Sequence, residues 1–284
     1  MRLGAPVFVD NLNPESFALA HVEKGYGAAA INETFHAGNP ENAKYLAELK
    51  KHNIIVGEVN MGMLNAMSLD PAERKKGIDH CKERLTLADE LEAKGFVAIV
   101  GTYHPTWWAG PHPRNFTKEF IEDAVEVWTE ITESVKPKHS KVEFEMVPFN
   151  FMDNMDACAE FISRLNPNYV GLHFDPCNYM TSMRNLMNNG DYIDEVFDKY
   201  SKDILTLHAK DISVNEKSCT IVMSETFIGE GRMDYDTFLR RLNQMDPDTP
   251  IFLEHYRTAE DYEKQRQCFL KAAEHAGVEL VLPI

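Results

Sequence analysis

Short apolar runs rich in β-branched residues alternate with longer segments of helical spacing along this chain of 284 residues. Such alternation is typical of repeated strand–helix units built around a parallel sheet. We expect a strand in each of eight runs, at residues 6–10, 28–33, 54–59, 96–101, 142–147, 169–174, 204–209 and 251–256. Eight strands, each followed by a helix, predict a closed (β/α)8 TIM barrel, an α/β fold, as a single domain over residues 1–284.

The helical segments carry their own start and stop signals. The segment 71–95 begins with Pro71 and ends with Gly95, which we expect to stop the helix. A last helix over residues 259–276 follows the eighth strand and completes the ring. An open doubly wound sheet is the alternative architecture, but no GxGxxG motif follows the first strand.

Two connecting segments are longer than a minimal barrel needs. Residues 102–116, after the fourth strand, are rich in Pro, Gly, His and Trp, and residues 211–233, after the seventh strand, contain a further β-like run. Both leave the carboxyl ends of their strands. In this architecture the active site is built at that end of the barrel, from the loops that follow the strands.

Charge and cysteine content narrow the classes of partner. The formal net charge is -16 and no basic stripe is present, which argues against a nucleic acid or an anionic membrane as the partner. Five cysteines without CxxC spacing favour reduced thiols in a cytoplasmic protein. No window approaches the roughly 20 apolar residues of a membrane span. We therefore expect a cytoplasmic protein that acts on a small molecule.

Four neighbouring strands each deliver one potential metal ligand at the same end. These residues are Glu145, Asp175, His208 and Glu254. Taken alone, a strand-end Glu or His is more typical of a cap or an ion pair. Together, three carboxylates in one barrel mouth repel one another unless a cation or a shared proton relieves them. A mostly oxygen ligand set suits Mn²⁺, Mg²⁺ or Co²⁺, and Zn²⁺ is also compatible. We predict one divalent metal, with Mn²⁺ as the first choice.

The same residues resemble those of the xylose isomerase-like barrel superfamily, and in particular its sugar phosphate isomerase/epimerase branch. The fragments EMVPF, FDPCNYM, HAKD and GEGRMDY carry this resemblance, which extends over nearly the whole chain. It implies that the four residues hold one divalent metal, and that Glu145 and Glu254 also act as acid and base on opposite faces of the substrate.

The reaction that the resemblance implies is removal of a proton next to a carbonyl in a sugar, through a metal-stabilised enediolate. Return of a proton from the opposite face inverts the centre, as in an epimerase. Return to the adjacent carbon converts an aldose and a ketose into each other, as in an isomerase. The sequence does not indicate which glutamate removes the proton.

One position departs from the family pattern. Asn178 stands where the epimerases of this family usually carry a histidine, three residues after the aspartate. Asparagine can hydrogen-bond a sugar hydroxyl, but it neither shuttles protons nor supplies a second metal ligand. This departure weakens a strict ketose 3-epimerase assignment. It weakens a likeness to endonuclease IV more, because that relative uses the equivalent histidine in a three-zinc cluster.

Five other residues near the predicted mouth are candidates for function. His104, at the end of the fourth strand, is a candidate acid, base or hydroxyl partner, with a solvated loop histidine as the alternative. Trp107 and Trp108 could stack on a sugar ring or an aromatic aglycone, or pack beneath the loop or at a subunit contact. Lys210 could reach a substrate oxyanion, or form a surface ion pair with the aspartate that follows it. Arg232 could bind a hydroxyl or phosphate, or cap its loop.

A second layer of polar residues is expected beneath the ligands. Glu143 has the strand parity of Glu145 and therefore lies one layer deeper in the barrel. A charge buried there needs a partner, and His173, two residues before Asp175, has the matching parity.

Two competing functions remain beside a sugar isomerase or epimerase. The first follows from a resemblance of this branch to the large subunit of C-glycoside deglycosidases, which eliminates an aglycone from an oxidised sugar and needs a smaller second subunit. The Trp-rich loop and Asn178 fit this alternative. The second is a non-catalytic sugar-binding or assembly barrel, against which the complete ligand set counts. A homo-oligomer is compatible with each. The absence of a phosphate-binding Gly-rich loop favours an unphosphorylated substrate.

Overall fold

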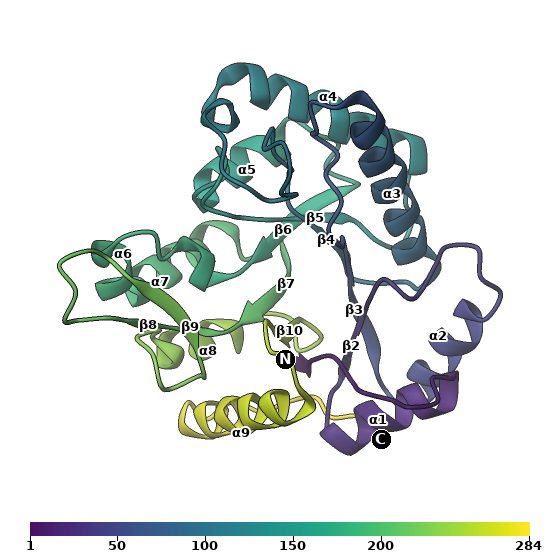
Figure 1. Cartoon of the computed structure of the whole chain (residues 1–284). Helices are drawn as coiled ribbons and strands as arrows, with labels where there is room; N and C mark the ends of the chain where they lie inside the picture. The colour runs from purple at the N-terminus through teal and green to yellow at the C-terminus, as the bar shows by residue number, and fades with distance from the viewer.

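Eight parallel strands close into one barrel in the computed structural model, which describes residues 1–284 (Figure 1). Around the barrel each strand pairs with its neighbours in the order β1-β10-β7-β6-β5-β4-β3-β2. The strands are β1 (Arg2–Gly4), β2 (Ala28–Ile31), β3 (Ile55–Asn60), β4 (Gly95–Ala98), β5 (Val142–Glu145), β6 (Val170–Phe174), β7 (Ile204–Ala209) and β10 (Pro250–Leu253). The predicted TIM barrel is confirmed.

Helices surround the barrel, and several begin at side chains that cap them. Asn13 and Ser16 form a reciprocal capping box at the first helix, and Asp70 accepts hydrogen bonds from two backbone N–H groups at the third. The helices are α1 (Pro14–Lys24), α2 (Asn42–Lys51), α3 (Pro71–Glu90), α4 (Lys118–Val135), α5 (Met155–Ser163), α6 (Met183–Met187), α7 (Asn189–Tyr200), α8 (Tyr235–Leu242) and α9 (Ala259–His275). No helix has both the length and the apolar character that a membrane crossing requires.

Two of the predicted boundaries differ most from the structure. The first strand lies at Arg2–Gly4 rather than at residues 6–10, because only the earlier segment pairs with β10 and β2. Helix α3 ends at Glu90, and Gly95 begins β4 instead of stopping the helix. The glycine at residue 95 has a steric role in the strand. A Cβ atom there would overlap the buried carboxylate of Glu143 inside the barrel.

The insertion after β7 forms a two-stranded antiparallel hairpin, β8 (Asp211–Val214) and β9 (Met223–Thr226), outside the barrel sheet. In Figure 1 it lies beside α6 and α7. Ile212 of the hairpin packs in a small buried cluster with Cys177 and Met180, which follow β6. The hairpin is thereby held next to the carboxyl ends of β6 and β7. We call the end of the barrel where the carboxyl ends of the strands lie the barrel mouth.

Candidate metal centre

The four predicted ligands come together at the barrel mouth. Glu145 is the last residue of β5, Asp175 and Glu254 directly follow β6 and β10, and His208 lies near the end of β7. Each offers one ligand atom, and these four atoms all lie within 4.8 Å of one another. The four strands are neighbours in the barrel, so the matching strand ends bring the side chains together. The chemistry of the donor set, three carboxylates and an imidazole, fits a divalent metal.

One ring nitrogen of His208 faces the other candidate ligands. Its Nδ1 lies 3.5 Å from Glu145 Oε1 and 3.2 Å from Glu254 Oε2. The atom is buried, yet it makes no hydrogen bond. Buried polar atoms without a partner are rare, and an absent ion is one of the recognised explanations. This nitrogen therefore supports the fit of a metal to the site.

Lys210 is a further member of the site rather than a surface residue. Only 1% of its surface is exposed, and its Nζ lies 2.7 Å from Asp175 Oδ2 and 2.6 Å from Glu254 Oε2. The alternative of a surface ion pair with Asp211 is wrong. Asp211 instead accepts backbone hydrogen bonds from Gly229, Gly231 and Met233, which orders the GEGR turn.

Burial and the neighbouring charges determine which side chains at the barrel mouth are ionised. Burial raises the pKa of Glu145, and the negative charge of Glu254 adds to this effect. Burial also opposes the ionisation of Glu254, but the positive charges of His208 and Lys210 hold its pKa well below the usual range. Burial works against the charged form of Lys210, and Asp175 and Glu254 nevertheless raise its pKa well above the usual value. The cluster therefore holds opposite charges together in the metal-free protein.

The second layer predicted beneath the ligands is present, with one residue between the two partners. Thr206 donates a hydrogen bond of 2.7 Å to Glu143 and lies 2.8 Å from His173 Nδ1. Glu143 and His173 themselves are 3.9 Å apart. Burial raises the pKa of Glu143 well above its usual value and lowers the pKa of His173 well below its own, so the pair is neutral.

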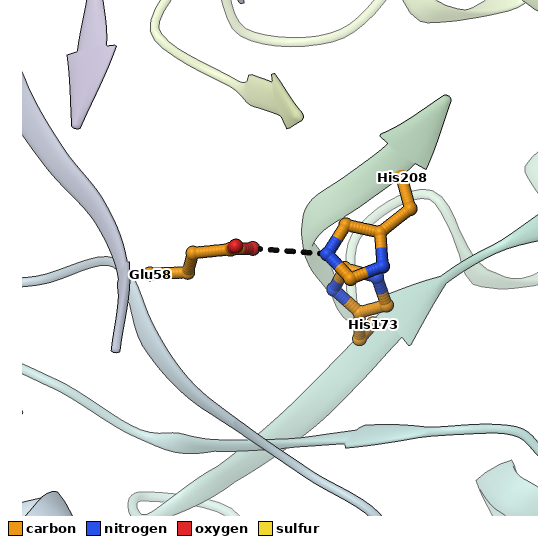
Figure 2. Close-up of side chains that lie close together, drawn as sticks. All are labelled: Glu58, His173 and His208. Atoms are coloured by element: carbon orange, nitrogen blue, oxygen red, sulfur yellow. Dashed lines mark hydrogen bonds and ion pairs between the residues drawn. The ribbon is translucent and has the colours of Figure 1, made fainter. Parts of the chain in front are cut away.

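The barrel interior holds an acidic residue that was not among the predicted site residues. Glu58 of β3 is buried, and its Oε2 lies 3.2 Å from Nε2 of His208 (Figure 2). The ring of His173 packs against that of His208, with 4.0 Å between the ring centroids. The available signal was Glu58 itself, a charged residue within the apolar run IIVGEVN. Its contact with β7, however, crosses the barrel and has no trace in the local sequence.

Two rim residues were also missed. His255 follows Glu254 in a left-handed conformation, with φ of 67°. Its Nδ1 lies 2.8 Å from Glu225 of the β8–β9 hairpin, and its Nε2 lies 3.2 Å from Glu254. Burial opposes its charge, but hydrogen bonds to these two carboxylates raise the pKa of His255 to about 9. The hairpin thus supplies an acidic group to the edge of the site.

The predicted substrate-binding residues divide into two groups. Asn178 belongs to the site, because its amide donates a 2.8 Å hydrogen bond to Glu145. Arg232 instead pairs with Glu216 on the exposed side of the hairpin and makes no polar contact with the four ligands. Substrate binding by Asn178 and Arg232 remains a prediction.

The loop after β4 holds the remaining candidates. Strand β4 ends at Ala98, so His104 lies in the loop and not at the strand end as expected. Its Nδ1 accepts a 2.9 Å hydrogen bond from the backbone N–H of Trp107, which makes it a turn-forming residue in this structure. Trp108 packs against the main core, whereas Trp107 is 48% exposed and lies 6.0 Å, centroid to centroid, from Phe149. Their catalytic and stacking roles remain predictions.

Comparison with solved structures finds chains of the same fold. A D-tagatose 3-epimerase-like protein is 21% identical, with a TM-score of 0.68 and 98% of each chain covered. The IOLI protein, solved with a zinc atom, is 20% identical, with a TM-score of 0.65 over 98% of this chain and 96% of its own. The 3-keto-D-glucoside 4-epimerase YcjR from E. coli is 13% identical, with a TM-score of 0.66 over 96% and 99%.

Sequence comparison identifies the family. No curated protein matches the chain. A family model described as xylose isomerase-like TIM barrel matches residues 20–273, which is most of the chain. With the closed eight-stranded barrel and the ligand cluster at its mouth, this match shows that the chain belongs to the xylose isomerase-like TIM barrel family.

Proposed function

We propose that this protein is a divalent-metal-dependent sugar isomerase or epimerase, with Glu145, Asp175, His208 and Glu254 as the metal ligands. The observation that carries the proposal is the convergence of these four ligand atoms within 4.8 Å of one another at the barrel mouth. The structural neighbours include proteins described as sugar epimerases, and one was solved with zinc. Mn²⁺ is the metal that we propose first.

A bound divalent ion would supply Lewis-acid polarisation of a substrate carbonyl and hydroxyl. Glu145 and Glu254 come from strands separated by β6 and β7, so they reach a substrate from different sides. We propose that one takes the proton next to the carbonyl and the other returns one. Asn178 holds Glu145 through its amide, and Lys210, at the side of Glu254, offers positive charge to the substrate oxygen.

The first experiment measures bound metal. Protein purified without a metal-affinity tag is incubated with Mn²⁺, dialysed and analysed for metal content. We expect about one equivalent in the wild type and a loss of most of it in Asp175→Asn and His208→Ala. The control is Asp153→Asn, the same change at an exposed aspartate that has no contact with the four ligands. Wild-type protein without metal after this incubation would refute the proposed function.

The second experiment measures proton exchange. Unphosphorylated ketoses and aldoses are incubated with the loaded protein in D₂O, and deuterium incorporation next to the carbonyl is followed by NMR. Incorporation should require the metal and be lost in Glu145→Gln and Glu254→Gln. Deuterium incorporation without formation of a new sugar indicates a substrate that is converted only slowly. No deuterium incorporation with any sugar of the panel argues against an isomerase or epimerase.

One observation favours a second candidate, the large subunit of a C-glycoside deglycosidase. Trp107 and Phe149 form an exposed aromatic pair beside the mouth, which suits an aromatic aglycone better than a sugar alone. In that case the metal content would be the same, but a smaller polypeptide would copurify from the native source and a 3-keto C-glycoside would release its aglycone. Neither a second subunit nor a homo-oligomer is tested by this structure, and both stay predictions.

A further inference from the structure

The barrel interior places a carboxylate against the nitrogen of His208 that faces away from the other ligands. Glu58 of β3 is only 3% exposed, and its Oε2 lies 3.2 Å from His208 Nε2. Its second oxygen, Oε1, accepts a 3.1 Å hydrogen bond from the amide of Asn60. Figure 2 shows Glu58 extending across the interior from β3 toward the imidazole on β7. Glu58 is therefore fixed at both oxygens.

The two nitrogens of His208 have different surroundings. Nε2 faces Glu58, whereas Nδ1 faces Glu145 and Glu254 and makes no hydrogen bond. A carboxylate only accepts hydrogen bonds, so Nε2, beside Glu58, carries a hydrogen. In the metal-free protein Nδ1, beside Glu145 and Glu254, carries one as well, and the ring is positively charged. A metal binds the nitrogen that gives up its hydrogen, and Nδ1 is the nitrogen that faces the other candidate ligands.

His173 supports the ring but does not replace Glu58. Its Nδ1 is engaged by Thr206 at 2.8 Å, and Thr206 in turn donates to Glu143. The remaining nitrogen, Nε2, is buried and makes no hydrogen bond. His173 therefore acts on His208 through the packing of the two rings, with 63° between their planes.

We propose that Glu58 is a positioning residue, whose carboxylate holds the hydrogen of His208 on Nε2 and so directs Nδ1 toward the metal. This inference rests on the proposed metal site. Carboxylates that bind the far nitrogen of a metal-bound histidine raise its basicity and fix its orientation, and their loss typically weakens metal binding about 10- to 100-fold. Glu58 itself touches neither metal nor substrate in this arrangement.

The test variant is Glu58→Gln, which keeps the length of the side chain and removes its charge. Its amide can present either an oxygen or an N–H to His208, so the hydrogen is no longer held on Nε2. Zinc, which is diamagnetic, is titrated against a competing chelator. We expect zinc affinity to fall about 10- to 100-fold in this variant. In the control Glu33→Gln, at an exposed glutamate after β2 that has no hydrogen bond or ion pair with the ligands, it should change less than about twofold.

A spectroscopic measurement separates positioning from a general structural effect. In protein labelled with ¹⁵N-histidine, long-range ¹H–¹⁵N correlations show which ring nitrogen carries hydrogen, and His208 is assigned by its absence in His208→Asn. We expect hydrogen on both nitrogens in the metal-free wild type, and zinc binding to remove it from Nδ1 while Nε2 keeps its hydrogen. In Glu58→Gln, hydrogen should be lost from Nε2 in part of the molecules.

The outcomes are distinct. A wild type that binds no zinc contradicts the proposed function, while the NMR of the metal-free protein still tests the role of Glu58. A bare Nε2 in the wild type, or unchanged zinc affinity in a folded Glu58→Gln, overturns the positioning role. Two zinc equivalents in the wild type, with one lost in Glu58→Gln, would also overturn it, because Glu58 would then be a ligand. If the variant does not fold, the wild-type spectrum decides.

Discussion

Replacing Lys210 by methionine should destabilise the metal-free protein strongly. Methionine keeps much of the length of the side chain and removes its charge. In the wild type the Lys210 ammonium lies 2.7 Å from Asp175 and 2.6 Å from Glu254, and it is almost fully buried. The variant leaves both carboxylates in the mouth without this partner.

The magnitude follows from the geometry. For one ion pair at 2.7 Å, Coulomb's law gives about 6 kcal/mol at an effective dielectric constant of about 20. The cost of burying the lysine charge offsets part of this attraction. Removal of one partner from a buried ion pair typically costs about 3–5 kcal/mol, and we expect Lys210→Met to lower the free energy of unfolding by about that amount.

Urea unfolding followed by circular dichroism measures this change, first with EDTA and then with saturating Mn²⁺. Bound metal should reduce the difference in free energy of unfolding between the wild type and Lys210→Met. The reason is that a bound cation replaces the lost positive charge and binds only the folded state. The matched control is Lys199→Met, an exposed lysine that also pairs with two carboxylates, Asp156 and Glu195, and whose loss should hardly change stability. Stability of Lys210→Met within about 1 kcal/mol of the wild type in EDTA would refute the reasoning.

Two further predictions concern the framework of the barrel. His21 is buried in α1, and burial lowers its pKa from 6.5 to about 4, so the unfolded chain binds a proton over a pH range in which the folded chain does not. Stability from neutral His21 is complete above pH 6.5 and is lost as the pH falls toward 4, by about 3 kcal/mol. The difference in free energy of unfolding between wild type and His21→Leu should shift accordingly between pH 7 and pH 4.5, and a constant difference would contradict it. Gly95→Ala should cost about 1–3 kcal/mol in urea unfolding, because the new methyl group would overlap the enclosed Glu143 carboxylate. If Gly95→Ala is as stable as the wild type, the prediction is wrong and the Glu143 side chain can move away from the new methyl group.

The architecture and the cluster of four candidate ligands were predictable because both depend on local patterns. Apolar runs at regular intervals indicated eight strands, and closure into a barrel places their carboxyl ends on one face. A polar residue at a strand end is visible without knowledge of its neighbours. Glu145, Asp175, His208 and Glu254 could therefore be named as one cluster, since four successive strands of a barrel are also neighbours in space.

The errors arose where the local composition pointed to the wrong boundary. Residues 6–10 have the composition of a strand and Arg2–Gly4 does not, but only Arg2–Gly4 pairs with β10 and β2. Gly95 follows a helical pattern and so suggests a helix stop. Its actual role, making space for Glu143, depends on a residue of β5 that is distant in the sequence.

By itself, the sequence determined the barrel, the end of it where the candidate site lies and the four residues that cluster there, because strand period and strand ends are properties of contiguous residues. The tertiary structure alone decided which charges meet. Glu58 reaches His208 across the barrel, and Lys210 enters the mouth to lie between Asp175 and Glu254. The tilt and stagger of closed strands set such contacts, and neither has a signature in the local sequence.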